Sequence, residues 1–261
     1  MKRAEIQPIP AAPLVSVLMT SYNYAQFVAE AIQSVYDQTY RPLELVIVDD
    51  GSTDASVDII REAIRNAPIP TEFITQKNAG QASALNNAFK NAHGEVVCFI
   101  DSDDLWLPEK VERTLEFMRK HPEGGVYQHQ LDKAQGDVEK QLLVSGDILQ
   151  EWMRVGKINV HKNKELVGVF LPTTGLAMYK QVLDHVFPIP EQLITCPDAY
   201  LSRASCCHGP LYSNLATLGS WRDHGANAGK GRFSFREYWL PVVMPAINEY
   251  FERKELPIRF V

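Results

Sequence analysis

The sequence contains no apolar run of the roughly 20 residues that a membrane-spanning helix requires. Its opening segment, MKRAEIQPIPAAP, has two early basic side chains but no apolar core, which argues against a signal peptide. The net charge of −6 gives no electrostatic reason to expect a nucleic acid as a partner. These absences predict a cytoplasmic protein without a transmembrane segment, attached at most to the inner face of a membrane.

Cysteine is scarce, and the four cysteines show neither CxxC spacing nor the pattern of a secreted disulfide framework. They are therefore expected to be reduced thiols in a cytosolic protein. The HExxH signature of zinc hydrolases is absent, and no GxGxxG follows the first predicted strand, which argues against a nicotinamide dehydrogenase. The segment GANAGKG looks like a phosphate loop, but its spacing is wrong and no Ser or Thr follows its lysine.

Apolar strands and amphipathic helices alternate regularly over the first 120 residues. The predicted strands are 14–20, 43–50, 71–76 and 95–101, and the predicted helices are 24–38, 52–66, 80–92 and one that Pro108 opens. Strands that are apolar throughout are buried on both faces. The pattern therefore predicts an α/β fold with a Rossmann-like, mostly parallel sheet and helices on both of its faces.

This alternation ends after about residue 122. We expect strands around a turn over 124–144, a short helix over 147–155, a strand running into a helix over 175–186, a helix over 197–209 and a strand over 211–221. Residues 232–255 are expected to be mostly helical, with kinks at Pro241 and Pro245. No linker rich in Gly, Pro or Ser separates the two halves, so a single domain is predicted.

Polar segments follow each of the predicted parallel strands, namely TSYN, DDGSTD, QKNAGQ and DSDD. Because ligands of such sheets bind beyond the carboxyl ends of the strands, these segments should meet at one rim. In DSDD, Asp101 and Asp103 point to the same side of an extended chain, and two carboxylates suit Mg²⁺ or Mn²⁺. An acidic turn before the helix at Pro108 would account for the same residues without a ligand, so the pair alone leaves both interpretations open.

Three residues at the other strand ends are candidates for binding a nucleoside. Asp50 can accept hydrogen bonds from a base N–H or from ribose hydroxyls. Tyr22 offers a surface for stacking and Asn23 a polar contact. Ordinary packing within the loop would account for Tyr22 equally well.

Taken in order, VSVLMTSYN, SVYDQTYRPLELVIVDDGSTD and QKNAGQASALNNAFKNAHGEVVCFIDSDD resemble the family 2 glycosyltransferases over about residues 13–120. The resemblance implies the GT-A fold and the transfer of a sugar from a nucleoside-diphosphate sugar to an acceptor hydroxyl, with inversion. It also implies Mn²⁺ or Mg²⁺ as cofactor, a carbohydrate or glycolipid acceptor, and a place in polysaccharide or glycolipid synthesis. The single domain, 1–261, would comprise a nucleotide-sugar-binding half (13–120), an acceptor and catalytic half (121–231) and a helical tail (232–261).

The resemblance also implies roles for individual residues. DSDD supplies the DxD motif of the family, and the metal ligands would be Asp101, Asp103 and, from WRDHGANAG, His224. In TCPDAYL, Asp198 stands in the place of the catalytic base, with Pro197 where the family usually has Glu. The donor would be bound by Thr20, Tyr22, Asn23, Asp50, Lys77, Gly80, Gln81, Asn86, Asp101 and Ser102. One departure is Leu85, at a position where many members carry Arg.

Two of these residues, and the function itself, also admit a second interpretation. Asp198 after a proline also fits a charge that interacts with a helix dipole, and His224 also fits a surface histidine. A nucleotidyltransferase shares the nucleotide-binding half-fold, but it would carry a basic, Gly-rich loop after the first strand, and TSYNYAQF is not such a loop. A non-catalytic nucleotide-sugar-binding protein is the third alternative, and only Pro197 and Leu85 favour it.

Overall fold

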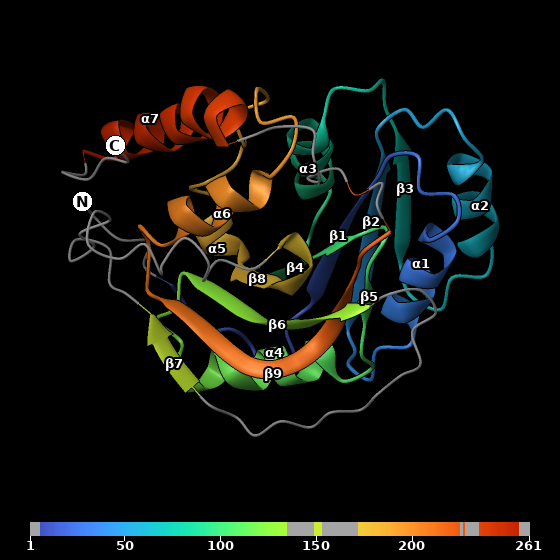
Figure 1. Ribbon diagram of the computed structural model, residues 1–261. Coiled ribbons are helices and arrows are strands. Elements are labelled where there is room, and N and C mark those ends of the chain that lie inside the picture. Colours follow the sequence, from blue (N-terminus) through green and yellow to red (C-terminus); the bar gives the residue numbers. More distant parts are fainter. Residues whose placement is uncertain (1–5, 135–148, 153–171, 225–226, 228–234, 256–261) are drawn as a thin grey trace.

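The computed structural model describes residues 6–134, 149–152, 172–224, 227 and 235–255. Their strands form one nine-stranded sheet in the order β3-β2-β1-β4-β8-β6-β9-β5, and β7 pairs with β9 beside this path (Figure 1). The predicted α/β fold with a mostly parallel central sheet is confirmed.

The first half of the sheet is parallel, as predicted from the alternating pattern. Its strands are β1 (Val15–Ser21), β2 (Leu43–Asp49), β3 (Thr71–Thr75) and β4 (Val96–Asp101). The helices that follow them are α1 (Val28–Tyr36), α2 (Ser56–Ala63), α3 (Gln81–Lys90) and α4 (Lys110–Lys120). The first two helices begin later than expected, because turns and bends precede each of them.

Alternate side chains of the parallel strands point to opposite faces of the sheet and enter two separate apolar layers. Leu18 and Phe99 belong to the layer that packs against α3, α6 and α7. Val17 and Cys98 belong to the layer that packs against α1, α2 and α4. Figure 1 shows α3 and the α1–α2 pair on opposite sides of the parallel strands. Burial on both faces explains why these strands are apolar throughout.

The second half of the sheet is mixed. Strand β8 (Leu176–Tyr179) runs antiparallel to β4 and to β6 (Val126–Ala134), and β6 is parallel to the long strand β9 (Leu211–Arg222). The short strand β5 (Leu105–Trp106) pairs antiparallel with β9. The turn η2 (Thr173–Gly175) precedes β8, and helices α5 (Lys180–Leu183) and α6 (Pro197–Ser205) follow it. The elements predicted over 175–186, 197–209 and 211–221 are present, although the second helix ends at Ser205, whereas 135–144 lie outside the described residues.

The prediction of a helix over 147–155 is wrong for 149–152, the part of this segment that the structure describes. Leu149–Trp152 form strand β7, which pairs antiparallel with Leu211–Asn214 of β9. The backbone groups of β9 supply hydrogen-bond partners that a local pattern cannot reveal, and tertiary pairing overrides a weak local preference.

The tail is helical over 235–253, as predicted. It consists of the π-helix η3 (Phe235–Val243) and of α7 (Met244–Arg253). Pro241 lies inside the π-helix, and Pro245 lies in the first turn of α7. Within the described ranges, no helix combines the length and the apolar composition needed to cross a membrane.

The strand order places a topological switch point between β1 and β4. The chain leaves β1 for β2 on one side, while β4 pairs with the other side of β1. Thr20 is in register with Asp101, and Ser21 is in register with Asp49. Open α/β sheets bind their ligands in the crevice at such a point. The fold therefore brings the polar strand ends together, as the sequence predicted.

Candidate functional site

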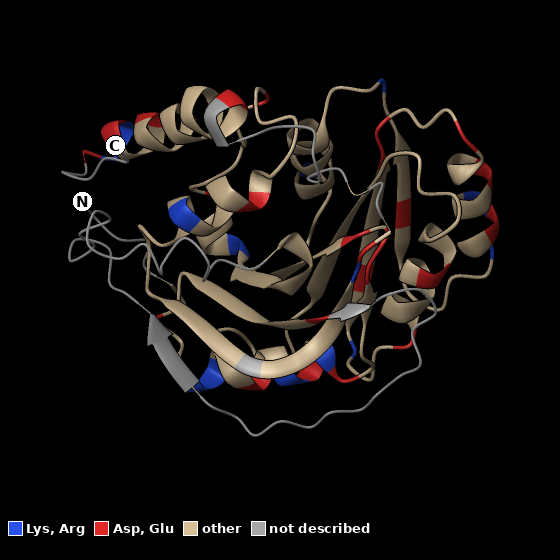
Figure 2. Ribbon diagram, viewed as in Figure 1, with Lys and Arg blue, Asp and Glu red and all other residues tan. Residues whose placement is uncertain are grey.

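The DSDD segment begins at the last residue of β4, and Figure 2 shows acidic segments at the edge of the sheet where the parallel strands end. Asp101 is held from two sides. Its Oδ1 accepts a hydrogen bond from Nε2 of Gln81 (3.0 Å), and its backbone N–H donates to Oγ1 of Thr174 (3.0 Å). Burial, followed by the negative charges of Asp104, Asp103 and Asp198, holds the pKa of Asp101 well above its usual range.

Asp104 has a different environment, because it is completely buried. One carboxylate oxygen accepts a hydrogen bond from the hydroxyl of Thr174, and the other accepts the backbone N–H of Arg222 (2.9 Å). Burial and then the charge of Asp103 raise the pKa of Asp104 to about 7. Asp104 thus joins the end of β4 to η2 and to the end of β9, so it is a structural acid rather than one that faces a ligand.

Asp103 and His224 are in direct contact. Nε2 of His224 lies 3.0 Å from Oδ2 of Asp103. The side chain of His224 is 10% exposed and that of Asp103 is 8% exposed. Asn227 donates to the same Asp103 oxygen (3.3 Å) and to the backbone oxygen of Arg222 (2.7 Å). Two of the three predicted metal ligands, which are 121 residues apart in the chain, therefore meet at one point.

The residues at this point fit a divalent cation. Carboxylate oxygens and an imidazole nitrogen are donors that Mn²⁺ accepts, and carboxylates also suit Mg²⁺. Burial and then the charges of the neighbouring acids raise the pKa of Asp101, and a cation would relieve the repulsion between these acids. Among the described residues, no three or more His, Cys, Asp or Glu side chains are already arranged around a metal position. Oxygens of a donor diphosphate would have to complete the coordination.

Asp198 lies in the first turn of α6, directly after Pro197. Burial raises its pKa, while the positive charge of Arg203 acts in the opposite direction. The charge of Asp198 in turn helps to raise the pKa of Asp101, so the predicted base and the DxD motif are electrostatically coupled. A carboxylate with a raised pKa is a better proton acceptor near neutral pH.

Tyr238, a residue that sequence analysis missed, holds the backbone segment that precedes Asp198. Its hydroxyl accepts the backbone N–H of Thr195 (3.1 Å) and donates to the backbone oxygen of the same residue (2.9 Å). Cys196, which follows, adopts a left-handed backbone conformation (φ 54°) immediately before Pro197. No motif in the sequence marks Tyr238, because its role depends on η3 lying against the 194–196 segment.

Asp50 organises the loop between β3 and α3. Its carboxylate accepts hydrogen bonds from Nε2 of Gln76 (2.8 Å) and from the backbone N–H groups of Ala79 (2.9 Å) and Gly80 (2.8 Å). Gly80 needs its positive φ of 94°, and a Cβ there would lie 2.8 Å from Cα of Ile194. Asp50 thus shapes the crevice, and its contact with a nucleoside stays a prediction.

Asn23 connects the end of β1 to the loop after β2. It has a positive φ (57°), and its Oδ1 accepts the backbone N–H groups of Thr53 (2.7 Å) and Asp54 (3.3 Å). Its own N–H donates to Oγ of Ser52 (2.8 Å). The adjacent Tyr22 is 37% exposed at the rim, where its ring is accessible to a ligand. Donor contacts of Tyr22 and Asn23 stay predictions.

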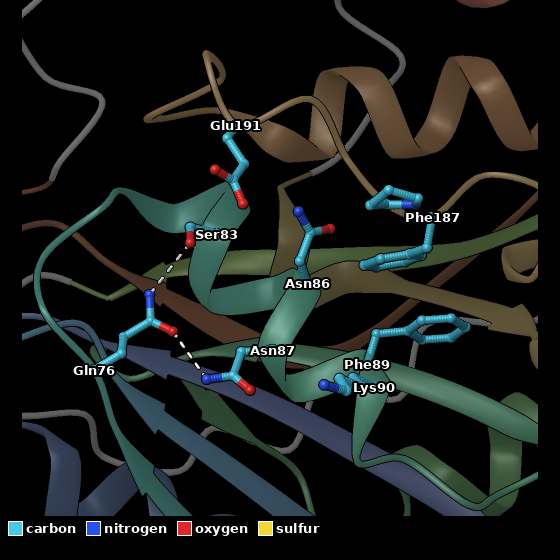
Figure 3. A pocket seen from close by; sticks show the side chains of 9 residues that line it. Gln76, Ser83, Asn86, Asn87, Phe89, Lys90, Phe187 and Glu191 are labelled. Carbon is cyan, nitrogen blue, oxygen red and sulfur yellow. Dashed lines mark hydrogen bonds between the residues drawn. The ribbon is translucent and has the colours of Figure 1, made fainter.

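Asn86 has both ends of its amide engaged. Nδ2 donates to the backbone oxygen of Ile189 (2.8 Å), and Oδ1 accepts the backbone N–H of the same residue (2.7 Å). Asn86 also lines a groove of about 560 Å³ at α3, beside the stacked rings of Phe89 and Phe187, whose centroids are 4.0 Å apart (Figure 3). Asn86 therefore holds the segment after Phe187, and its predicted contact with the donor is not tested by this geometry.

The remaining predicted contacts differ in exposure. Lys77 is exposed, Thr20 is buried at the end of β1, and Ser102 is buried with a hydroxyl that lacks a hydrogen-bond partner in the described part of the chain. Leu85 is buried in the apolar layer of α3. At this position the leucine packs into the core, so it supplies no charge to the crevice.

Residues 16–187 match the family model described as Glycosyl transferase family 2. The uncharacterized glycosyltransferase alr2836 of a Nostoc species is 38% identical over 216 residues, which are 82% of this chain and 66% of that protein. The putative teichuronic acid biosynthesis glycosyltransferase TuaG of Bacillus subtilis is 41% identical over 106 residues, which are 41% of this chain and 42% of that protein. The chain thus spans less than two thirds of the length of these relatives.

Solved structures share the fold. The Staphylococcus aureus protein TarS (residues 1–349), in complex with UDP, superposes with a TM-score of 0.68 at 22% identity, over 91% of this chain and 65% of that chain. The mannosyltransferase PcManGT from Pyrobaculum calidifontis, in complex with GDP-Man and Mn²⁺, gives a TM-score of 0.62 at 18% identity, over 87% and 62%. The fold is GT-A, and because the family match covers the larger part of its length, the chain belongs to glycosyl transferase family 2.

Proposed function

We propose that this chain is a metal-dependent, inverting glycosyltransferase that moves a sugar from a nucleoside-diphosphate sugar to an acceptor hydroxyl. The observation that carries the proposal is the contact between Asp103 and His224, 3.0 Å apart, at the switch point of the sheet. Asp198 lies close enough to this point for its negative charge to raise the pKa of Asp101. One crevice would then contain both the metal ligands that serve a donor diphosphate and the base that serves an acceptor hydroxyl.

Asp101, Asp103 and His224 would hold Mn²⁺ or Mg²⁺. The ion, when bound, stabilises negative charge on the departing diphosphate. Asn227 keeps Asp103 and the end of β9 together through its two hydrogen bonds. Gln81 fixes the orientation of the Asp101 carboxylate, and the buried Asp104 fixes the backbone of Arg222 two residues before His224.

Asp198 would remove the proton from the acceptor hydroxyl. The hydroxyl oxygen then attacks the anomeric carbon from the face opposite the diphosphate, and the bond from that carbon to the diphosphate oxygen breaks, which inverts the configuration. Burial of Asp198 supports this role, because it makes the carboxylate a stronger proton acceptor. The hydrogen bonds of Tyr238 to Thr195 hold the chain that leads into α6.

The donor would be bound by the rim of the parallel strands. Tyr22 would stack on the base, and Asn23 and Asp50 would contact the nucleoside. The other predicted contacts are Thr20, Lys77, Gly80, Gln81, Asn86, Asp101 and Ser102. Similar structures hold UDP, UDP-GlcNAc or GDP-Man, which supports the nucleoside-diphosphate sugars as the substrate class. TuaG and the chondroitin synthase of Escherichia coli support a carbohydrate or glycolipid acceptor in polysaccharide or glycolipid synthesis.

A panel of nucleotide sugars tests the proposal. We expect one donor to raise the melting temperature with Mn²⁺ but not with EDTA, and nucleoside diphosphate to be released when acceptor saccharides are added. Asp103→Ala should abolish the metal-dependent shift. Asp58→Ala is the matched control, because Asp58 is an acid on α2 with an 86% exposed side chain. If no donor in the panel causes a shift or releases diphosphate, the proposal is wrong.

A further inference from the structure

The imidazole of His224 packs on two aromatic rings from the turn that opens α1. Its centroid lies 4.4 Å from that of Phe27, at an interplanar angle of 36°, and 5.5 Å from that of Tyr24, at 82°. Nε2 points to Asp103, whereas Nδ1 is buried and has no hydrogen-bond partner within the described ranges. A metal-binding histidine usually donates its second ring N–H to an oxygen, which sets the orientation of the ring. Here the neighbouring rings provide the packing that orients the imidazole.

Phe27 also supports Arg222, two residues before His224. The guanidinium carbon lies 4.8 Å from the centroid of the Phe27 ring, and Nη2 of Arg222 lies 2.6 Å from Oε2 of Glu30 in α1. The arginine side chain is only 11% exposed. The Phe27 ring therefore packs against two side chains at and just after the end of β9.

The turn that carries Phe27 is itself well anchored. The backbone oxygen of Tyr24 accepts the N–H groups of Phe27 (2.9 Å) and Val28 (3.0 Å), and the N–H of Tyr24 donates to Oγ of Ser56 in α2 (3.0 Å). Val28, the first residue of α1, is completely buried. A ring held on such a turn can restrict the motion of the imidazole that packs on it.

We infer that Phe27 is a positioning residue for His224, and that by keeping the imidazole directed at Asp103 it sets the affinity of the site for a divalent cation. The inference rests on the proposed function. An imidazole that is free to rotate must lose side-chain entropy when it binds a metal, and a restricted one has already lost it. Loss of a group that orients a metal ligand typically weakens metal binding roughly 10- to 100-fold.

Calorimetric titration of Mn²⁺ tests this inference, in the presence of UDP or GDP, whichever raises the melting temperature of the wild type. Phe27→Ala should weaken Mn²⁺ binding roughly 10- to 100-fold. In the His224→Ala background the same substitution should have no further effect, because the ligand that it positions is gone. Phe27→Tyr keeps the ring and should bind Mn²⁺ like the wild type. Phe89→Ala, at another partly buried ring on α3, is the matched control and should leave the affinity unchanged.

Phe27→Leu keeps apolar volume but removes the ring, and it replaces Phe27→Ala in the titration if the alanine variant does not fold. It should weaken the affinity in the same non-additive way. Wild-type affinity in both ring-deleted variants would overturn the inference, as would a loss of equal size with and without His224. If the wild type binds Mn²⁺ and nucleoside diphosphate and His224→Ala binds Mn²⁺ equally well, the inference fails together with the assignment of His224 as a metal ligand, while the transferase proposal stands. If the wild type binds neither nucleoside diphosphate nor Mn²⁺, the proposed function fails.

Discussion

Asp104→Asn should change how the stability of the protein depends on pH. The carboxyl is completely buried between Thr174 and the backbone of Arg222, and its pKa is raised from 3.8 to about 7. A raised pKa in the folded state means that the contribution of the group to stability is fully present below pH 4 and is lost as the pH rises through about 7. At about 1.4 kcal/mol for each unit of pKa, a difference of roughly 3 units corresponds to about 4 kcal/mol.

Asparagine keeps the size of the side chain and an oxygen for the N–H of Arg222, but it does not titrate. The variant should therefore gain up to about 4 kcal/mol relative to the wild type between pH 4 and pH 8. At pH 4 it should be about 1 kcal/mol less stable, because the hydroxyl of Thr174 loses its acceptor.

Urea unfolding at several pH values, with EDTA present and circular dichroism as the signal, measures this difference. Asp58→Asn, at an exposed acid of α2, should run parallel to the wild type throughout. A constant gap between Asp104→Asn and the wild type from pH 4 to pH 8 would show that Asp104 does not titrate with a raised pKa. The buried acid would then be ionised at all these pH values, and the reasoning from burial would be refuted.

Three further predictions concern Asp198, Tyr238 and Lys110. Asp198→Asn should lower the transfer rate about 10²- to 10⁴-fold in single-turnover assays and leave donor affinity nearly unchanged; normal turnover with a lower melting temperature would make Asp198 structural. Tyr238→Phe should lower the free energy of unfolding in urea by roughly 1–3 kcal/mol, because the backbone N–H and the backbone oxygen of Thr195 both lose their hydrogen-bond partner. In the same variant kcat should fall while KM for the donor stays unchanged. An unchanged kcat would contradict the role of Tyr238 in positioning Asp198. Lys110 is completely buried, and its Nζ lies 3.7 Å from the centroid of the Trp106 ring. Lys110→Met should raise the free energy of unfolding at pH 7, because burial lowers the pKa of the lysine in the folded protein. This gain should shrink toward pH 10.5, since the lysine then also loses its proton in the unfolded chain and the wild type is no longer destabilised. A less stable methionine variant at every pH would contradict this.

The sequence alone predicted the parallel half of the fold because its signals are local. Uniformly apolar strands such as β1 and β4 indicate burial on both faces, and the intervening helices have one apolar face. The polar segments that follow those strands indicated the rim, since parallel strands present their carboxyl ends together. Leu149–Trp152 were predicted wrongly because their state depends on a partner strand about 60 residues later in the chain, which no local pattern reports.

Within DSDD, the sequence determined that Asp101 and Asp103 stand at the end of a strand and, through the resemblance, what such a pair would bind. Only the tertiary structure decided what each acid contacts: Gln81 for Asp101, His224 for Asp103, and Thr174 with the backbone of Arg222 for Asp104. The support that Phe27 gives to His224 and that Tyr238 gives to Thr195 likewise has no signature in the chain. Hydrophobic periodicity is a property of neighbouring residues. The environment of a buried polar group is set by residues that come together only when distant segments pack.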